Sequence, residues 1–250
     1  DRSRAPLSRR ERARMELYRG QCNCAYWHGV FGGLYLPFLR FETYRHLLAA
    51  ERQVAAPRLR PAVAVEDYDL DGRPEVCLTT AGAKLYVKPD RGGHAYEWDD
   101  LEKCVNLMAN FTRREESYHR KLLERVARAK AGSTEIASIH DQVLVKEEGL
   151  ERRLVYDPHV RESLVDHVFA PGASLEAVAS GTAAELGAWP WAACEWERTK
   201  RHGVRLAAKA GSGRLEKWIL PDGARGFAVR VVLDAGAEAE GATYAMEFNV

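Results

Sequence analysis

The stretch PEVCLTTAGAKLYVKPDRGGHAYEWDD (residues 74–100) decides the fold class. Apolar and polar residues alternate along its short runs, and the turn sequences TAGA and DRGG separate these runs. Runs of the same kind precede it as AVAVEDYD (62–69) and follow it near the C-terminus as VRLAAKA, EKWIL, GFAVRVVLD and TYAMEFNV. Short strands at regular spacing are typical of a sandwich or barrel. The sequence therefore predicts a mainly β protein built on a large β-sandwich, with further strands at QVLVKEE (142–148) and RRLVYD (152–157).

Two segments have helical periodicity instead. In residues 34–54, apolar side chains recur at steps of three and four, and a proline stands near the start, where a missing N–H costs least. The apolar positions are Leu34, Phe38, Phe41, Tyr44 and Leu48. A second helix is predicted over residues 101–130, where Tyr118, Leu122 and Val126 share one face.

A boundary is expected at AAPRLRP (55–61), because this stretch has two prolines and no periodicity. The predicted domains are a helical segment over residues 1–56 and a β-sandwich over residues 57–250. Because TYAMEFNV ends inside a strand pattern, we expect the sandwich to be truncated at its C-terminal end, and the chain to be a fragment.

Composition excludes several classes of protein. The 37 Lys and Arg residues balance 36 Asp and Glu, and the net charge of +1 gives no global field that would attract nucleic acid or an anionic membrane. The sequence contains no apolar run long enough to cross a membrane and no signal peptide. The five cysteines are odd in number and scattered, which favours a reducing, cytoplasmic setting.

The segment QCNCAYWHGVFGG (21–33) has the residues of a shaped loop, because its three glycines disfavour a helix. Tyr26 and Trp27 offer flat apolar rings next to the ring nitrogens of His28, which is the chemistry of a sugar-binding surface. The alternative is that the two aromatic residues anchor the loop in a core. Cys22 and Cys24 have poor spacing for a zinc clasp, and the simpler interpretation is that they pack beneath the loop.

An acidic loop, EDYDLDGRPEV (66–76), resembles the first nine positions of a calcium loop. Its predicted ligands are Asp67, Asp69, Asp71 and Glu75. The glutamate expected at the twelfth position is missing, and DLDGR is also a good tight-turn sequence. The sequence thus predicts a structural calcium ion with a plain turn as the alternative.

No nucleophile, acid/base pair or phosphate loop is evident. The run QCNCAYWHGVFGGLYLPFLR (21–40), however, resembles the last signature region of glycoside hydrolase family 57, the α-amylase and 4-α-glucanotransferase group. EDYDLDGRPEVCLTT, GGHAYEWDD, NLMANFTRREESYHRKL and SIHDQVLVKEEGLERRLVYD resemble the large β-sandwich that follows the catalytic barrel in these enzymes.

This resemblance implies that the chain is the C-terminal part of a retaining enzyme that cleaves or transfers α-1,4-linked glucans. The family's Glu nucleophile and Asp acid/base belong to barrel regions not found in this sequence, so we expect no catalytic residue in this chain and no activity of it alone. Its substrate-binding residues would be Trp27 for stacking, with Asn23, Cys24, Tyr26 and His28 shaping the pocket. No cofactor is expected for catalysis.

Two positions depart from the family pattern. Cys24 stands where glucanotransferase-like members carry an acid, which leaves hydrolysis or transfer open, and Phe38 replaces a histidine. The expected partner is an α-glucan or maltooligosaccharide, without nucleic acid or membrane, and a homodimer is retained as compatible with the sequence. The alternatives are a non-catalytic carbohydrate-binding or scaffolding β-sandwich module and a calcium-stabilised structural domain.

Overall fold

The computed structural model describes residues 6–28, 31–55, 59–130, 149–236 and 239–250. Residues 1–110 together with 161–250 form one compact unit, and residues 111–160 form a second. Among the described residues, no helix is both long enough and apolar enough to cross a membrane. The division predicted at residues 56 and 57 falls between the last helix of the N-terminal segment and the first strand, and it stays a prediction.

The first unit contains the sheet predicted from residues 62–100. Its antiparallel strands lie in the order of the chain, and their neighbours pair in register, with Val76 opposite Val87 and Leu85 opposite Trp98. The strands are β1 (Ala62–Glu66), β2 (Glu75–Thr79), β3 (Ala83–Lys88), β4 (His94–Asp100) and β5 (Val105–Asn106). The mainly β prediction is confirmed here.

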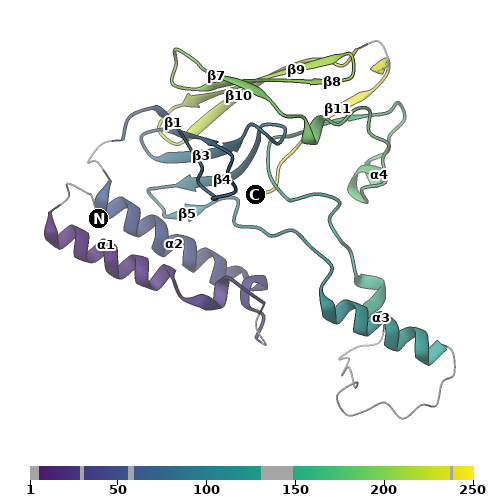
Figure 1. Ribbon diagram of the computed structural model, residues 1–250, viewed down its shortest axis with the longest axis horizontal. Helices are drawn as coiled ribbons and strands as arrows, with labels where there is room; N and C mark the ends of the chain where they lie inside the picture. Colours follow the sequence, from purple (N-terminus) through teal and green to yellow (C-terminus); the bar gives the residue numbers. More distant parts are fainter. Residues whose placement is uncertain (1–5, 29–30, 56–58, 131–148, 237–238) are drawn as a thin grey trace. The chain divides into compact units, whose positions relative to one another are not determined.

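A second antiparallel sheet has the order β10-β9-β8-β7, and β6 pairs with β11 in a two-stranded ribbon (Figure 1). These strands are β6 (Val165–Phe169), β7 (Glu195–Arg198), β8 (Val204–Ala210), β9 (Gly213–Asp222), β10 (Gly226–Asp234) and β11 (Thr243–Glu247). Val76 and Val87 from the first sheet pack in one core with Val204, Leu206 and Ile219 from the second, and all five are fully buried. The two sheets therefore form the predicted sandwich.

A hairpin of two helices precedes the sandwich: α1 (Leu7–Gly20) and α2 (Pro37–Val54). Pro37 occupies the first turn of α2, as expected for a residue without an N–H. Nδ1 of His46 on α2 lies 2.6 Å from Oε2 of Glu16 on α1. A Cβ on Gly20 would lie 2.7 Å from Leu47, so glycine lets the helices approach closely where α1 ends.

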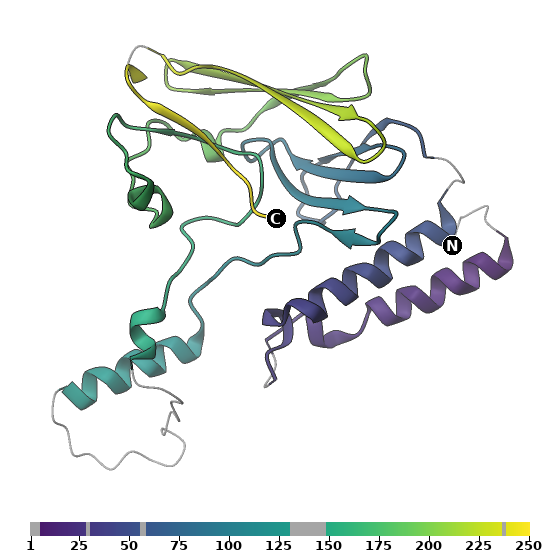
Figure 2. The ribbon, with the colours of Figure 1, turned by 180° about the vertical axis from the view of Figure 1, so that it is seen from behind.

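The face of the first sheet that turns away from the core is polar, because strand side chains alternate between the two faces. Thr79, Lys84, Tyr86, Glu97 and Asp99 occupy this face in register across β2, β3 and β4. Helix α2 covers it (Figure 2). Lys84 pairs with Glu51 of α2, and the hydroxyl of Tyr44 donates to Glu97 at 3.3 Å.

The helix predicted over residues 101–130 is only half right. It begins at Ser117 as α3 (Ser117–Lys130), while residues 101–106 form a turn and strand β5. The Asp100 carboxylate accepts the N–H groups of Glu102 and Lys103 at 3.0 Å, and this local turn replaces the helix.

The strand predicted over residues 152–157 is wrong. Residues 150–153 form a short 3₁₀ helix, and residues 154–157 are not part of a strand. In this unit the Arg113 guanidinium and backbone N–H instead bond to the Asp157 carboxylate, with Nε to Oδ1 at 3.0 Å. The strand predicted over residues 142–148 lies outside the described residues.

Candidate functional site

The predicted sugar-binding segment is a turn between α1 and α2, built from two short 3₁₀ helices at Asn23–Ala25 and Gly33–Tyr35. The N–H of Leu34 donates to the carbonyl of Trp27 at 3.0 Å, which closes the turn. Gly33 has φ +54°, a conformation that side chains other than glycine rarely adopt. Gly29 and Val30 lie outside the described residues.

The aromatic residues of the turn lie at the surface. Trp27 is 55% exposed and Tyr26 is 58% exposed, so Trp27 is not the core anchor that the alternative interpretation required. Tyr26 is held because its hydroxyl donates to the carbonyl of Gly20 at 2.6 Å, and partial burial raises the pKa of this phenol. The His28 ring packs edge-on against Tyr35, with centroids 5.1 Å apart. The turn thus presents aromatic side chains at the surface.

Asn23 and Cys24 lie in the same turn and are both exposed. The Cys24 thiol is directed at Oδ1 of Asn23, 3.7 Å away. Cys22 is also an exposed free thiol, so the expectation that the two cysteines pack beneath the loop is wrong. All five predicted substrate-contacting residues therefore lie together on an accessible turn.

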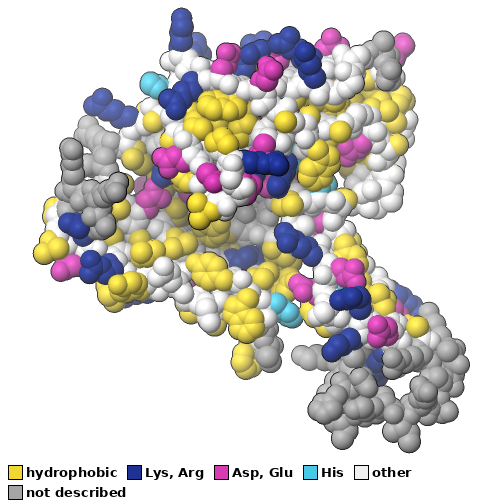
Figure 3. Space-filling view, in the orientation of Figure 1, with side chains coloured by type: hydrophobic (Ala, Val, Ile, Leu, Met, Phe, Trp, Pro, Cys, Tyr) yellow, Lys and Arg dark blue, Asp and Glu magenta, His cyan; other side chains and the backbone are white. Residues whose placement is uncertain are grey.

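Further exposed apolar side chains lie on the turn and on the two helices. Phe31 is 92% exposed and Phe38 is 60% exposed, and Phe41 and Tyr18 are exposed as well. Hydrophobic side chains also gather over the helical hairpin in the space-filling view (Figure 3). Exposed apolar surface of this extent usually marks an interaction site.

The predicted calcium ligands are brought together in part. Carboxylate oxygens of Asp67, Asp69 and Asp71 lie within 4.8 Å of one another. Glu75 is outside this group: it is fully buried, and its Oε2 accepts the backbone N–H of Tyr68 at 2.7 Å. Glu75 therefore stabilises the backbone of the acidic loop through this hydrogen bond and lies outside the group of possible calcium ligands.

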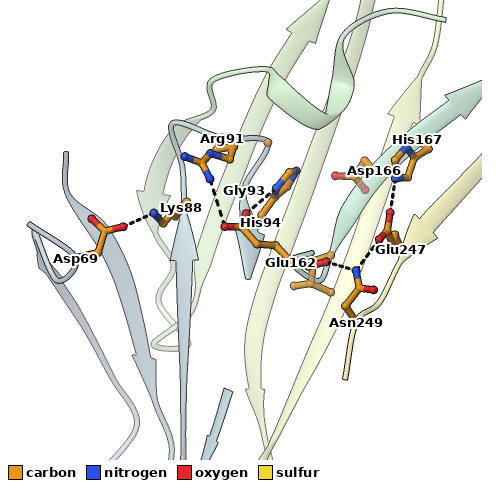
Figure 4. Close-up of polar contacts among 12 residues, drawn as sticks. Asp69, Lys88, Arg91, Gly93, His94, Glu162, Asp166, His167, Glu247 and Asn249 are labelled. Carbon is orange, nitrogen blue, oxygen red and sulfur yellow. Dashed lines mark hydrogen bonds and ion pairs between the residues drawn. The ribbon is translucent and has the colours of Figure 1, made fainter. Parts of the chain in front are cut away.

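The same three aspartates also stabilise the plain turn, which is the alternative to a calcium site. Asp67 accepts from the N–H of Gly72 at 3.0 Å, and Asp71 accepts from that of Arg73 at 2.8 Å. Lys88 pairs with Asp69 (Figure 4), and this hydrogen-bonded ammonium lowers the pKa of the Asp69 carboxyl. Three carboxylates at this spacing offer the oxygen ligands that calcium prefers, although Lys88 already neutralises Asp69.

Sequence reasoning missed a second polar site beneath α2. A cavity of about 410 Å³ is lined there by Tyr26, Tyr44, Glu97 and Asp99, among others. Burial, and next the Glu97 carboxylate, raise the pKa of Asp99 to about 9. The alternating polar residues of KLYVK and HAYEWDD were the available signal, but on their own they are typical of a solvent-facing side.

The described residues thus form an antiparallel β-sandwich preceded by a helical hairpin, whose connecting turn presents exposed aromatic side chains. The family profile "Alpha-amylase/4-alpha-glucanotransferase, C-terminal" matches residues 67–250, and the profile for the middle domain of the same proteins matches residues 2–54. The chain belongs to this family, glycoside hydrolase family 57, which confirms the resemblance.

Individual relatives agree with this assignment. The chain is 41% identical to alpha-amylase 1 of Dictyoglomus thermophilum over 67% of its own length and 23% of the relative's. It is 35% identical to the 4-alpha-glucanotransferase of Thermococcus litoralis, over 82% of this chain and 30% of that protein. The crystal structure of the latter superimposes with a TM-score of 0.69 at 32% identity, covering 89% of this chain and 31% of that chain. The chain thus corresponds to the C-terminal portion of such enzymes and spans less than a third of their length.

Proposed function

We propose that this chain contributes part of the substrate-binding surface to an enzyme that cleaves or transfers α-1,4-linked glucans. The observation that carries this proposal is the half-exposed Trp27 on a turn fixed by Gly33 and by the Tyr26 hydroxyl. An indole ring can stack on the C–H face of a glucosyl unit, while His28 and Asn23 hydrogen-bond its hydroxyls. Relatives named as amylases and glucanotransferases support an α-glucan as the ligand.

The test is the activity of the intact protein on maltooligosaccharides. Trp27→Ala removes the stacking surface. We expect a loss of roughly 1–3 kcal/mol of transition-state binding, which lowers kcat/KM, and little change in the stability of the protein. Trp191→Ala is the matched control, because Trp191 is 50% exposed but belongs to a short helix near β7. Equal kcat/KM values for the two variants would contradict the proposal.

Cys24 is proposed to influence the choice between hydrolysis and transfer. Its thiol occupies the position where the family resemblance expects an acid, so a carboxylate that accepts a sugar hydroxyl is missing. Cys24→Asp should raise the ratio of disproportionation products to released reducing ends, whereas Cys22→Asp, at a neighbouring thiol that is also exposed, should leave this ratio unchanged. An unchanged ratio in Cys24→Asp would remove this role.

The 250-residue chain by itself is proposed to be inactive, since the family's catalytic carboxylates belong to regions outside its match. Glucan hydrolysis by this chain alone would overturn the fragment interpretation. Tight glucan binding by the chain alone, without any contribution to catalysis in the intact protein, would instead favour the carbohydrate-binding or scaffolding module.

Three further features are proposals of the same rank. We infer a structural calcium ion at Asp67, Asp69 and Asp71, supported by the convergence of their carboxylates. A reducing, cytoplasmic setting is supported by the five free cysteines. A homodimer is the third proposal, and sedimentation of the intact protein at several concentrations tests it.

A further inference from the structure

The cavity beneath α2 has an unusual wall. It lies between the helix and the polar face of the first sheet and is partly open to solvent, and its volume of about 410 Å³ exceeds what a single water requires. Tyr44 and Glu51 come from α2, and Tyr86, Glu97 and Asp99 come from β3 and β4. Acidic side chains therefore meet in a largely buried space.

Asp99 is the key residue of this wall. Its side chain is only 1% exposed, and neither of its carboxylate oxygens has a hydrogen-bond partner. A buried carboxylate without partners costs several kcal/mol, so native proteins rarely keep one. Asp99 therefore requires either a proton held with the neighbouring Glu97 carboxyl or a bound cation.

The nearby cations do not neutralise it. Lys84, which stands opposite Asp99 in the strand register, places its ammonium on Glu51. The Arg40 guanidinium donates from Nε to the carbonyl of Ala109 at 3.0 Å and from Nη1 to that of Leu34 at 2.6 Å. Within the described part of the chain, neither Glu97 nor Asp99 forms an ion pair.

Glu97 and Asp99 are positioned to act together. They are two residues apart on β4, so both carboxyl groups lie on the face beneath α2. Glu97 Oε2 accepts the Tyr44 hydroxyl at 3.3 Å, which connects the pair to the helix. A single shared proton would satisfy only one of the two Asp99 oxygens, whereas a metal ion can be bound by both.

We propose that Glu97 and Asp99 bind a divalent cation, Ca²⁺ in preference to Mg²⁺, in the cavity beneath α2. Two carboxylates balance the charge of such an ion, and the cavity has room for the waters that complete its coordination. Calcium accepts bidentate carboxylates and irregular oxygen geometry, whereas magnesium requires a near-ideal octahedron. The two proposed ligands belong neither to the Asp67 loop nor to the glucan-binding turn, although Tyr26 of that turn also lines the cavity.

The test measures the Tm of the intact protein in EDTA and in CaCl₂ or MgCl₂. All variants carry Asp71→Asn, which removes a ligand from the acidic loop, so that any remaining response arises elsewhere. At a calcium concentration near a hundred times the Kd, we expect the Tm to rise by roughly 5–10 °C, with a smaller response to magnesium. Adding Glu195→Gln, a change at an exposed glutamate of β7, should preserve the rise.

Adding Asp99→Asn should abolish the calcium response, while the Tm in EDTA stays equal or increases because the buried charge is gone. Retention of that Tm in EDTA shows that the variant folds. The proposal is overturned if calcium leaves the Tm of the Asp71→Asn protein unchanged, which would indicate that a proton neutralises the pair. It is equally overturned if Asp99→Asn responds to calcium as strongly as its parent.

Discussion

A Cβ atom on Gly33 would lie 2.1 Å from the carbonyl oxygen of Trp27, a distance that no side chain can accept. The same carbonyl accepts the N–H of Leu34, so it cannot move away without opening the turn. Gly33 therefore fixes the backbone of the residue proposed to stack on the glucan. The need for glycine at position 33 is therefore linked directly to the way in which the turn presents the Trp27 ring.

Gly33→Ala should consequently disturb the turn. We expect a loss of roughly 3 kcal/mol in the free energy of unfolding, because the clash with Trp27 adds to the positive-φ strain. Gly211→Ala is the matched control: its φ is +59°, but a Cβ there meets open space, so only strain of about 1–2 kcal/mol applies. Urea unfolding measures both, and equal losses would show that the contact with Trp27 is unimportant.

The strands of the first sheet were predictable because their alternation is local. Residues 76–78 of β2 pair with residues 85–87 of β3, as the alternation of their side chains predicts. The covering of the opposite face was not predictable, since Lys84, Glu97 and Asp99 have the sequence pattern of a solvent-facing side. Only long-range packing of α2 buries them.

The site was predictable to a similar extent. The glycines of residues 21–33 predicted a shaped loop, which the structure shows, but the exposure of Trp27 depends on how α1 and α2 meet, and the role of this turn in glucan binding stays a prediction. The turn after β4 was missed because it depends on the Asp100 carboxylate and on a positive φ of 54° at Cys104, which helical periodicity does not reveal.

A buried ion pair gives a second prediction. The Lys217 ammonium on β9 is fully buried, 2.7 Å from the Asp166 carboxylate on β6, and it also donates to the carbonyl of Leu164 at 2.6 Å. Lys217→Met should cost about 3–5 kcal/mol, because Asp166 becomes an unpaired buried charge.

The double variant Lys217→Met with Asp166→Asn serves as the control for this prediction. It should lose less stability than the sum of the single changes, since neither charge remains. Strict additivity in urea unfolding would show that the two groups do not interact energetically.

The acidic loop gives a third prediction. If calcium binds Asp67, Asp69 and Asp71, the intact protein should gain roughly 3 kcal/mol at a hundredfold excess of calcium over the Kd. Asp71→Asn should remove the part of this gain that arises at the loop, while Asp234→Asn, at the exposed end of β10, should leave the gain unchanged. A calcium-induced gain as large in Asp71→Asn as in the parent would leave only the plain turn, whose hydrogen bonds need no metal.

The last prediction concerns pH. The His167 ring lies between two carboxylates, with Nδ1 2.9 Å from Glu185 and Nε2 3.1 Å from Glu247 (Figure 4 shows the Glu247 contact). Burial opposes the charged ring, but hydrogen bonds to the two glutamates outweigh it and raise the pKa of His167 to about 9. The ordinary value in an unfolded chain is about 6.5.

Because the folded pKa is the higher one, the stabilisation is complete below about pH 6.5 and declines as the pH rises through about 9. We expect a loss on the order of 3 kcal/mol across this window. His167→Gln should remove that part of the pH dependence, whereas His202→Asn, a change at an exposed histidine, should keep it. Urea unfolding at pH 6, 7.5 and 9 measures the difference, and a pH profile of His167→Gln identical to that of the parent would contradict the role of this ring.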